Sequence, residues 1–181
     1  MNTRQHSLPV DLQACAQALL LRPEDSHKYD FGRVLVIGGC RAMAGAPALA
    51  GMAALRAGAG VVEIAVPESI ATTVAGFNPC LIVHALAEDA EGGFAAESLS
   101  GWQRLAQRAD VLVLGPGMGR ATHLEQAVLA LWQTFPRTLL VDADGLFALA
   151  SLPAEVLARP PGPRILTPHT GEMRRLSGSA P

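Results

Sequence analysis

The chain alternates short apolar runs with longer segments in which apolar residues recur at helical spacing. Six runs are typical of β-strands, at residues 33–38, 61–66, 80–86, 110–115, 137–142 and 164–167. The last three are apolar without alternation, which indicates a parallel sheet covered by helices on both faces. The pattern therefore predicts an α/β fold with a mostly parallel central sheet.

Three segments between or before these runs have the periodicity of amphipathic helices. Residues 11–21 form the first, and the other two stripes consist of Leu99, Trp102, Leu105 and Ala109, and of Ala121, Leu124, Val128, Leu131 and Trp132. No repeat, low-complexity tract or linker interrupts the pattern, although "ARPPGPR" at 158–164 predicts a stiff surface connection. We therefore expect residues 1–181 to form one domain.

Composition narrows the class of ligand. Half of the 181 residues are apolar, 17% are charged and the net charge is −2, which predicts a large core and argues against nucleic-acid or membrane binding. Cys15, Cys40 and Cys80 are few and far apart, so we expect small buried thiols in a reducing compartment. No early apolar run is long enough for a signal core or a spanning helix, and we expect a cytoplasmic protein with a small-molecule ligand.

The glycine-rich stretch "GPGMGR" at 115–120 follows the fourth apolar run. A dinucleotide fingerprint needs a third glycine where Arg120 stands, and no Gly-Lys-Ser/Thr follows for a Walker-type phosphate loop. The pattern instead favours a backbone nest that could hold an anionic group. We expect Gly117 and Gly119 to contact a ligand, and a branched side chain at Gly117 to block it while leaving the fold intact.

The first run is followed by glycines and then by a segment made largely of alanine and glycine. Pro47 suits the first turn of a helix. The small residues of this helix favour close packing on the sheet. Gly45 and Ala46, by contrast, are expected to leave backbone N–H groups uncovered at the carboxyl edge of the sheet, where ligands bind.

The fifth run ends in "VDADGL" at 141–146, in which two carboxylates are separated by one residue. A calcium loop is excluded, because Phe147 and Pro153 occupy the positions that require glycine and glutamate. Two roles stay open for Asp144: the cap of the following helix and a part in the site. Asp142, at the end of the strand, is the better candidate for ligand binding.

The sixth run ends in "LTPHTGEMRRL" at 166–176, where Pro168 stops the strand. His169 has no partner histidine at zincin spacing, so we expect a hydrogen bond to substrate and no metal site. Glu172 falls in the first turn of the next helix, where a negative charge is favoured.

In this order and at these separations, the segments "HKYDFGRVLVIGGCRAMAGAPALAGMAALRAGAG", "GPGMGR", "VDADGL" and "LTPHTGEMRRL" resemble the ADP- or ATP-dependent NAD(P)H-hydrate dehydratases. The resemblance implies a three-layer ribokinase-like α/β fold. It also implies that the substrate is the S epimer of NADH or NADPH hydrated at C6, whose hydroxyl is phosphorylated with ADP or ATP and Mg²⁺ before phosphate leaves. In this resemblance Ala46, Gly117 and His169 match contacts to the hydrated dinucleotide.

The resemblance also has departures. Relatives often have Pro-Glu where this chain has Pro79-Cys80, and the "GTGD" segment with the catalytic aspartate is expected beyond residue 181. The resemblance thus implies a C-terminally incomplete dehydratase domain, inactive alone, and a homo-oligomer for the complete protein. Two alternatives stay open: a non-catalytic dinucleotide-binding module, and a small-molecule kinase of the ribokinase superfamily.

Overall fold

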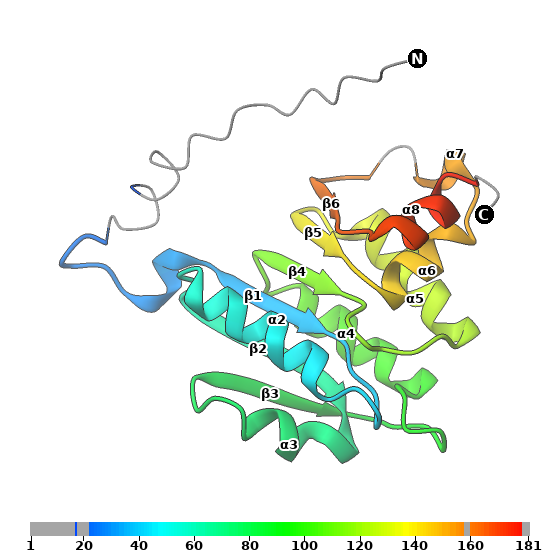
Figure 1. The fold of residues 1–181 in the computed structure, drawn as a ribbon. Helices are drawn as coiled ribbons and strands as arrows, with labels where there is room; N and C mark the ends of the chain where they lie inside the picture. The colour runs from blue at the N-terminus through cyan, green and yellow to red at the C-terminus, as the bar shows by residue number, and fades with distance from the viewer. Residues whose placement is uncertain (1–16, 18–21, 158–159, 179–181) are drawn as a thin grey trace.

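The structure, a computed structural model, describes residues 17, 22–157 and 160–178. Its centre is a six-stranded, entirely parallel sheet with the order β3-β2-β1-β4-β5-β6 (Figure 1). The strands are β1 (Arg33–Ile37), β2 (Val61–Pro67), β3 (Leu81–Leu86), β4 (Val111–Leu114), β5 (Thr138–Val141) and β6 (Arg164–Leu166). All six predicted strands are confirmed, with ends that differ by one residue at most.

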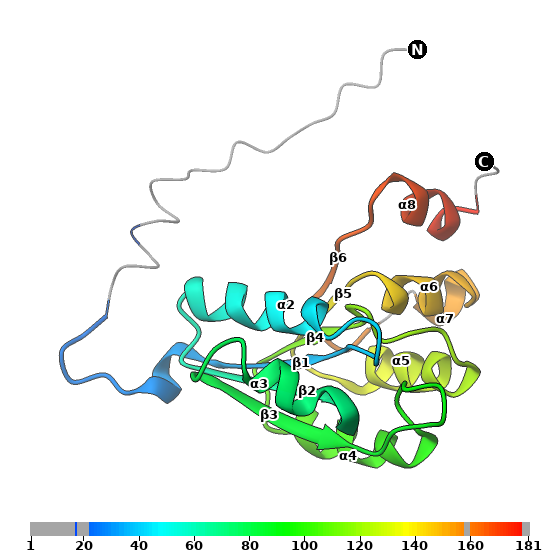
Figure 2. The same ribbon diagram turned by 60° about the horizontal axis from the view of Figure 1, so that its bottom comes forward.

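Helices cover both faces of the sheet, as Figure 2 shows for α2 on one side and α4 and α5 on the other. The α-helices are α2 (Gly45–Arg56), α3 (Ala71–Ala75), α4 (Leu99–Ala106), α5 (Thr122–Thr134), α6 (Asp144–Ala150), α7 (Ala154–Leu157) and α8 (Thr170–Leu176). Short 3₁₀ helices are η1 (Lys28–Phe31), η2 (Glu68–Ile70) and η3 (Ala96–Ser98). The expected α/β layers are confirmed. The two helical stripes are confirmed except at Ala109 and Ala121, which lie just outside α4 and α5. The helix expected at 11–21 falls almost entirely outside the described residues.

Two apolar clusters, one on each face, hold the layers together. Alternate residues of β1 point to opposite faces: Leu35 and Ile37 join the cluster beneath α4, α5 and α6, whereas Val36 joins the cluster beneath α2 and α3. This explains why the strand is apolar without a break, since neither face meets water.

The small residues of α2 let this helix lie close to the sheet. A side chain at Gly51 would place its Cβ 2.6 Å from Cδ1 of Ile64 on β2. Ala48, one turn earlier, is 1% exposed. The predicted packing role of the alanine- and glycine-rich helix body is confirmed.

The order in which strands are added to the sheet reverses between β1 and β4: β2 and β3 lie on one side of β1, and β4, β5 and β6 lie on the other. After β1 it crosses to α2 on one face, and after β4 it crosses to α5 on the other, so the two loops diverge from neighbouring strands. In open parallel sheets this reversal of strand order creates a crevice at the carboxyl ends of the strands, where ligands bind. The fold therefore places the loops 38–44 and 115–121 at the expected position for a site.

The cysteines differ from prediction. Cys80 is exposed and Cys40 is only partly buried, while Cys15 lies outside the described residues. Cys80 is exposed because it precedes β3 in a turn, where its N–H donates to the side chain of Asn78 at 2.9 Å. Within the described residues, no helix combines the length and apolar character needed to cross a membrane.

Candidate functional site

The loops after β1 and β4 are joined backbone to backbone. The N–H of Gly39 donates to the carbonyl of Pro116 at 2.8 Å. A Cβ on Gly38 would lie only 2.4 Å from that same carbonyl oxygen, a distance that side chains do not tolerate. Glycine at Gly38 is thus required for the two loops to meet.

Gly117 lies directly against the start of α2. A Cβ at this position would approach the Cβ of Met43 to 2.9 Å and the Cβ of Ala46 to 3.2 Å, and its φ of +65° favours glycine. Two residues expected to bind substrate, Ala46 and Gly117, are therefore neighbours. The expectation that a branched residue at Gly117 would leave the fold intact is wrong, because it would meet both close packing and backbone strain.

The start of α2 is more open than its contact with Gly117. Gly45 and Ala46 are the first two residues of the helix, rather than residues just before it. A Cβ built on Gly45 meets nothing within 4 Å. A ligand could therefore approach the backbone here.

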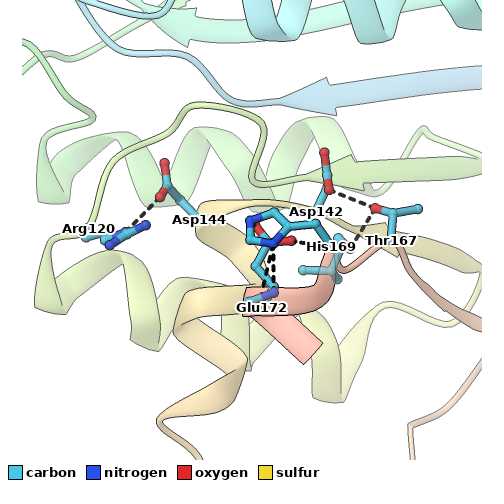
Figure 3. Close-up of polar contacts among 8 residues, drawn as sticks. Arg120, Asp142, Asp144, Thr167, His169 and Glu172 are labelled. Carbon is cyan, nitrogen blue, oxygen red and sulfur yellow. Dashed lines mark hydrogen bonds and ion pairs between the residues drawn. The ribbon is translucent and has the colours of Figure 1, made fainter. Parts of the chain in front are cut away.

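Asp144 holds the glycine loop instead of capping α6. Its Oδ2 accepts from the N–H of Gly119 at 3.1 Å, and its Oδ1 accepts from Nε of Arg120 at 2.9 Å (Figure 3). Of the two roles left open for Asp144, the helix cap is excluded: the N-cap is Ala143, and Asp144 already stands in the first turn. The anionic group held at Gly119 is, in this structure, the protein's own carboxylate.

Ala143 is the one non-glycine residue with positive φ in the part of the chain that the structure describes, at φ 49° and ψ −116°. Such a conformation costs an alanine about 1–3 kcal/mol and is concentrated at functional sites. The residue just before it, Asp142, accepts a hydrogen bond from the hydroxyl of Thr167 at 2.8 Å. Asp142 thereby ties the end of β5 to the segment after β6.

His169 and Glu172 form a reciprocal cap at the start of α8. Nδ1 of His169 accepts from the N–H of Gly171 at 3.0 Å and from that of Glu172 at 3.4 Å, while Oε2 of Glu172 accepts from the N–H of His169 at 2.9 Å. The imidazole is 73% exposed, and its Nε2 lies 3.3 Å from Oε1 of Glu172 (Figure 3). Glu172 stands in the first helical turn as predicted, and His169 has a structural role that the sequence did not reveal.

A cavity of about 530 Å³ opens beside these groups. Its lining consists of Met43, Gly117, Gly119, Arg120, Ala143, Asp144 and Glu172. Gly117 and Gly119 were predicted as ligand contacts, whereas Ala46, Asp142 and His169 lie next to lining residues and Gly45 begins the adjacent helix. Two other cavities lie between α4 and α5 or near the start of β5, away from the carboxyl ends of the strands.

An ion pair between Arg41 and Glu88 holds the loop between β1 and α2. Nη2 of Arg41 lies 2.6 Å from Oε1 of Glu88, and Oε2 of Glu88 accepts from the N–H of Ser69 at 2.8 Å. Hydrogen bonds from the side chain and backbone of Ser69, followed by that from Arg41, hold the pKa of Glu88 below its ordinary value of 4.5. The β1 loop is thereby anchored to the segments around β3.

Sequence reasoning missed Met43, Arg120 and Ala143. Met43 and Ala143 carry no polar group, and the unusual backbone of Ala143 has no signal in residue type. Arg120 could have been noticed, because a charged residue directly after a glycine loop stands at a strand end where ligands bind. Among the described residues, no group of three or more His, Cys, Asp or Glu side chains is arranged to hold a metal ion.

Comparison with known proteins identifies the family. Residues 34–181 match the family model described as NAD(P)H-hydrate dehydratase. The bifunctional NAD(P)H-hydrate repair enzyme Nnr of Salinibacter ruber is 41% identical over 158 residues, which are 87% of this chain and 29% of that enzyme.

Solved structures agree with the family match. The ADP/ATP-dependent NAD(P)H-hydrate dehydratase of Bacillus subtilis, crystallised with ATP and Mg²⁺, is 27% identical with a TM-score of 0.71, over 96% of this chain and 57% of that one. A ribokinase-like superfamily protein of Enterococcus faecalis, 23% identical, has the same fold, with a TM-score of 0.71 over 96% of this chain and 60% of its own. The chain thus spans less than a third of the bifunctional relative and under two thirds of these structures. It belongs to the NAD(P)H-hydrate dehydratase family and has the ribokinase-like α/β fold.

Proposed function

We propose that this chain binds the hydrated form of NADH or NADPH and contributes to its nucleotide-dependent dehydration, which restores the reduced dinucleotide. The observation that carries the proposal is the cavity at the reversal point between β1 and β4, in a chain of this family. Its wall contains glycine backbone at Gly117 and Gly119, which lets a flat ring approach closely.

The predicted contacts of the ligand are of two kinds in this proposal, exposed backbone and the imidazole of His169. Gly45, Ala46, Gly117 and Gly119 present backbone without bulky side chains. Because Nδ1 of His169 accepts the cap hydrogen bonds, Nε2 is the ring nitrogen that would donate to a ligand, in competition with Oε1 of Glu172 at 3.3 Å.

Asp142 supports the proposed site through a neighbouring residue. Its contact with Thr167 fixes the segment from which His169 projects. A substitution at Asp142 is therefore expected to alter the position of the imidazole as well as any direct contact with the ligand.

The proposed reaction needs ADP or ATP, since phosphorylation turns the ring hydroxyl into a leaving group that departs as phosphate. Mg²⁺ would travel with the nucleotide and offset the charge of its phosphates. We place the nucleotide and the catalytic carboxylate on the part of the family's length that this chain does not span. The residues described above would bind and orient the dinucleotide.

A non-catalytic dinucleotide-binding module is the second candidate, and one observation favours it. Asp142, Asp144 and Glu172, the carboxylates beside the cavity, each accept a hydrogen bond from the protein itself. A general base must instead reach the attacking oxygen. Incubating the chain with hydrated NADH, Mg²⁺ and ADP or ATP, and following the return of NADH absorbance, separates the two candidates.

Binding is tested by calorimetric titration of the chain with hydrated NADH and hydrated NADPH. Gly45→Leu adds a side chain where the protein has open space, so it should keep the fold and weaken binding at least about tenfold, roughly 1.4 kcal/mol. Ala53→Leu adds the same side chain to an exposed position of the same helix and should change nothing. The proposal fails if the wild-type chain binds neither compound, or if both variants bind as it does.

A further inference from the structure

Two arginines share one aromatic ring at the border of the cavity. Cζ of Arg120 lies 4.4 Å from the centre of the Phe147 ring, and Cζ of Arg175 lies 5.2 Å from the same centre. The two guanidinium groups can therefore be no farther apart than these two distances combined. They come from the glycine loop and from α8, which are distant in sequence.

The packing of α6 on α8 brings these groups to the cavity. Asp144 and Phe147 stand three residues apart on α6, and Glu172 and Arg175 stand three residues apart on α8. Residues at this spacing share a helix face. Since Asp144 and Glu172 line the cavity, Phe147 and Arg175 lie one turn along from its wall.

Both arginines have unused hydrogen-bonding capacity. Arg120 donates through Nε to Asp144, and its two terminal nitrogens make no hydrogen bond to any residue that the structure describes. The guanidinium of Arg175 makes no hydrogen bond or ion pair with the described residues and lies against the Phe147 ring. Stacking on Phe147 restricts how far either group can turn.

A pair of restrained arginines with open N–H groups is suited to a phosphate. Guanidinium groups bind phosphate oxygens through paired hydrogen bonds, and charge on both partners makes these bonds strong. Asp144 already offsets the charge of Arg120, and a bound phosphate would offset that of Arg175, which forms no ion pair with a described residue. A neutral sugar or an apolar group would have neither effect.

We infer that Arg120 and Arg175 form a binding site for a phosphate group of the hydrated dinucleotide, whose pyrophosphate would extend from the cavity toward Phe147. This inference rests on the proposed function for the identity of the dinucleotide, although the phosphate site itself can be tested without it. Arg120 would bind from the cavity wall and Arg175 from the outer side.

The experiment titrates the 181-residue chain with inorganic pyrophosphate, hydrated NADH and ADP in separate runs. Arg120→Gln and Arg175→Gln should each weaken binding of pyrophosphate and of hydrated NADH about tenfold, as expected for one lost charged contact. Arg174→Gln is the matched control: it removes the same charge from the adjacent position of α8 and should leave both affinities unchanged. Circular dichroism of all three variants checks that the fold is kept.

The outcomes distinguish this inference from the proposed function. Loss of pyrophosphate binding in the two variants, with no binding of hydrated NADH by the wild type, would support the phosphate site and contradict the dinucleotide. Hydrated NADH that binds equally to all variants would overturn the phosphate site and leave the proposed function standing. Arginine-dependent binding of ADP, with hydrated NADH unaffected, would also overturn it, because the site would then serve the second nucleotide.

Discussion

The two sides of the cavity are built in different ways. On the side of β1 and β4, the walls meet through backbone: Gly38 against Pro116, and Gly115 against the carbonyl of Asp142, which a Cβ would approach to 2.2 Å. On the side of α6 and α8, side chains make the contacts, as between the exposed imidazole of His169 and the largely buried carboxylate of Glu172. At Gly38, Gly115 and Gly117 the first side has no room for a side chain, whereas the second side can be altered one group at a time.

This difference determines what each experiment measures. A substitution in the backbone-built loops changes stability and affinity together, so its effect on binding is ambiguous. A substitution on the α8 side has a small effect on stability, and any larger loss of affinity there can be assigned to the ligand.

The largest effect is expected at Gly115. Gly115→Ala forces an alanine to φ +114° and into the backbone of Asp142 and Gly145, and should lower the free energy of unfolding by more than about 4 kcal/mol. Gly119→Ala is the control, because φ there is +82° but a Cβ meets nothing within 4 Å; it should cost only about 1 to 2 kcal/mol. Equal costs in urea denaturation would mean that the close approach contributes little.

The next effect separates the two roles of His169. His169→Ala removes the cap of α8 and should lower stability by about 1 kcal/mol, whereas His169→Asn keeps a capping oxygen and should restore most of it. If His169 also donates to the ligand, both variants lose affinity for hydrated NADH. Normal affinity in His169→Asn would restrict this residue to its capping role.

A substitution at Ala143, unlike the two before it, is expected to stabilise the protein. Ala143→Gly relieves the strained backbone at φ 49° and should raise the free energy of unfolding by about 1 kcal/mol. The same replacement at Ala53, in the exposed face of α2, should lower it by a similar amount, because glycine weakens a helix. A decrease at Ala143 would show that packing, rather than strain, dominates there.

The smallest effect is expected at Glu88, whose ion pair with Arg41 is a side-chain contact of the loop after β1. The pKa of Glu88 is lower in the folded chain than its ordinary value of 4.5, so its contribution to stability is present above that value and is lost as pH falls through the folded pKa. Glu88→Gln should therefore reduce the loss of stability on acidification below about pH 4.5. Glu91→Gln, at a residue that makes no ion pair with any described residue, serves as the control in urea titrations across this range.

Much of the fold could be predicted because its signals are local. The unbroken apolar runs 33–38 and 110–115 identify buried parallel strands, and the sheet then places whatever follows them at one edge. Gly117 and Ala46 could be chosen on this ground and through the family resemblance. Their contact with each other could not, since it depends on how two loops cross.

The contacts at the site that sequence analysis did not predict have one cause in common. Asp144 has the residue type and position of a helix cap, but the turn at Ala143 moves the helix start back and directs the carboxylate to Gly119. His169, predicted as a ligand contact, is also the N-cap of α8, and that second role was not predicted. When a polar side chain has two possible hydrogen-bond partners, the local backbone geometry determines which one it contacts. That geometry cannot be read from the residue type.

The central position of β1 in the sheet has a consequence for how this protein is made. Arg33 and Asp110, whose backbone N–H and carboxylate meet beside β1 and β4, are 77 residues apart. At about 5–20 residues per second, a ribosome needs roughly 4 to 15 s to supply the second after the first. Throughout that interval one edge of β1 is unpaired and can join another chain. The arrangement that creates a ligand crevice at the reversal point thus also leaves, during each round of synthesis, an interval in which an edge of β1 is open to pairing with another chain.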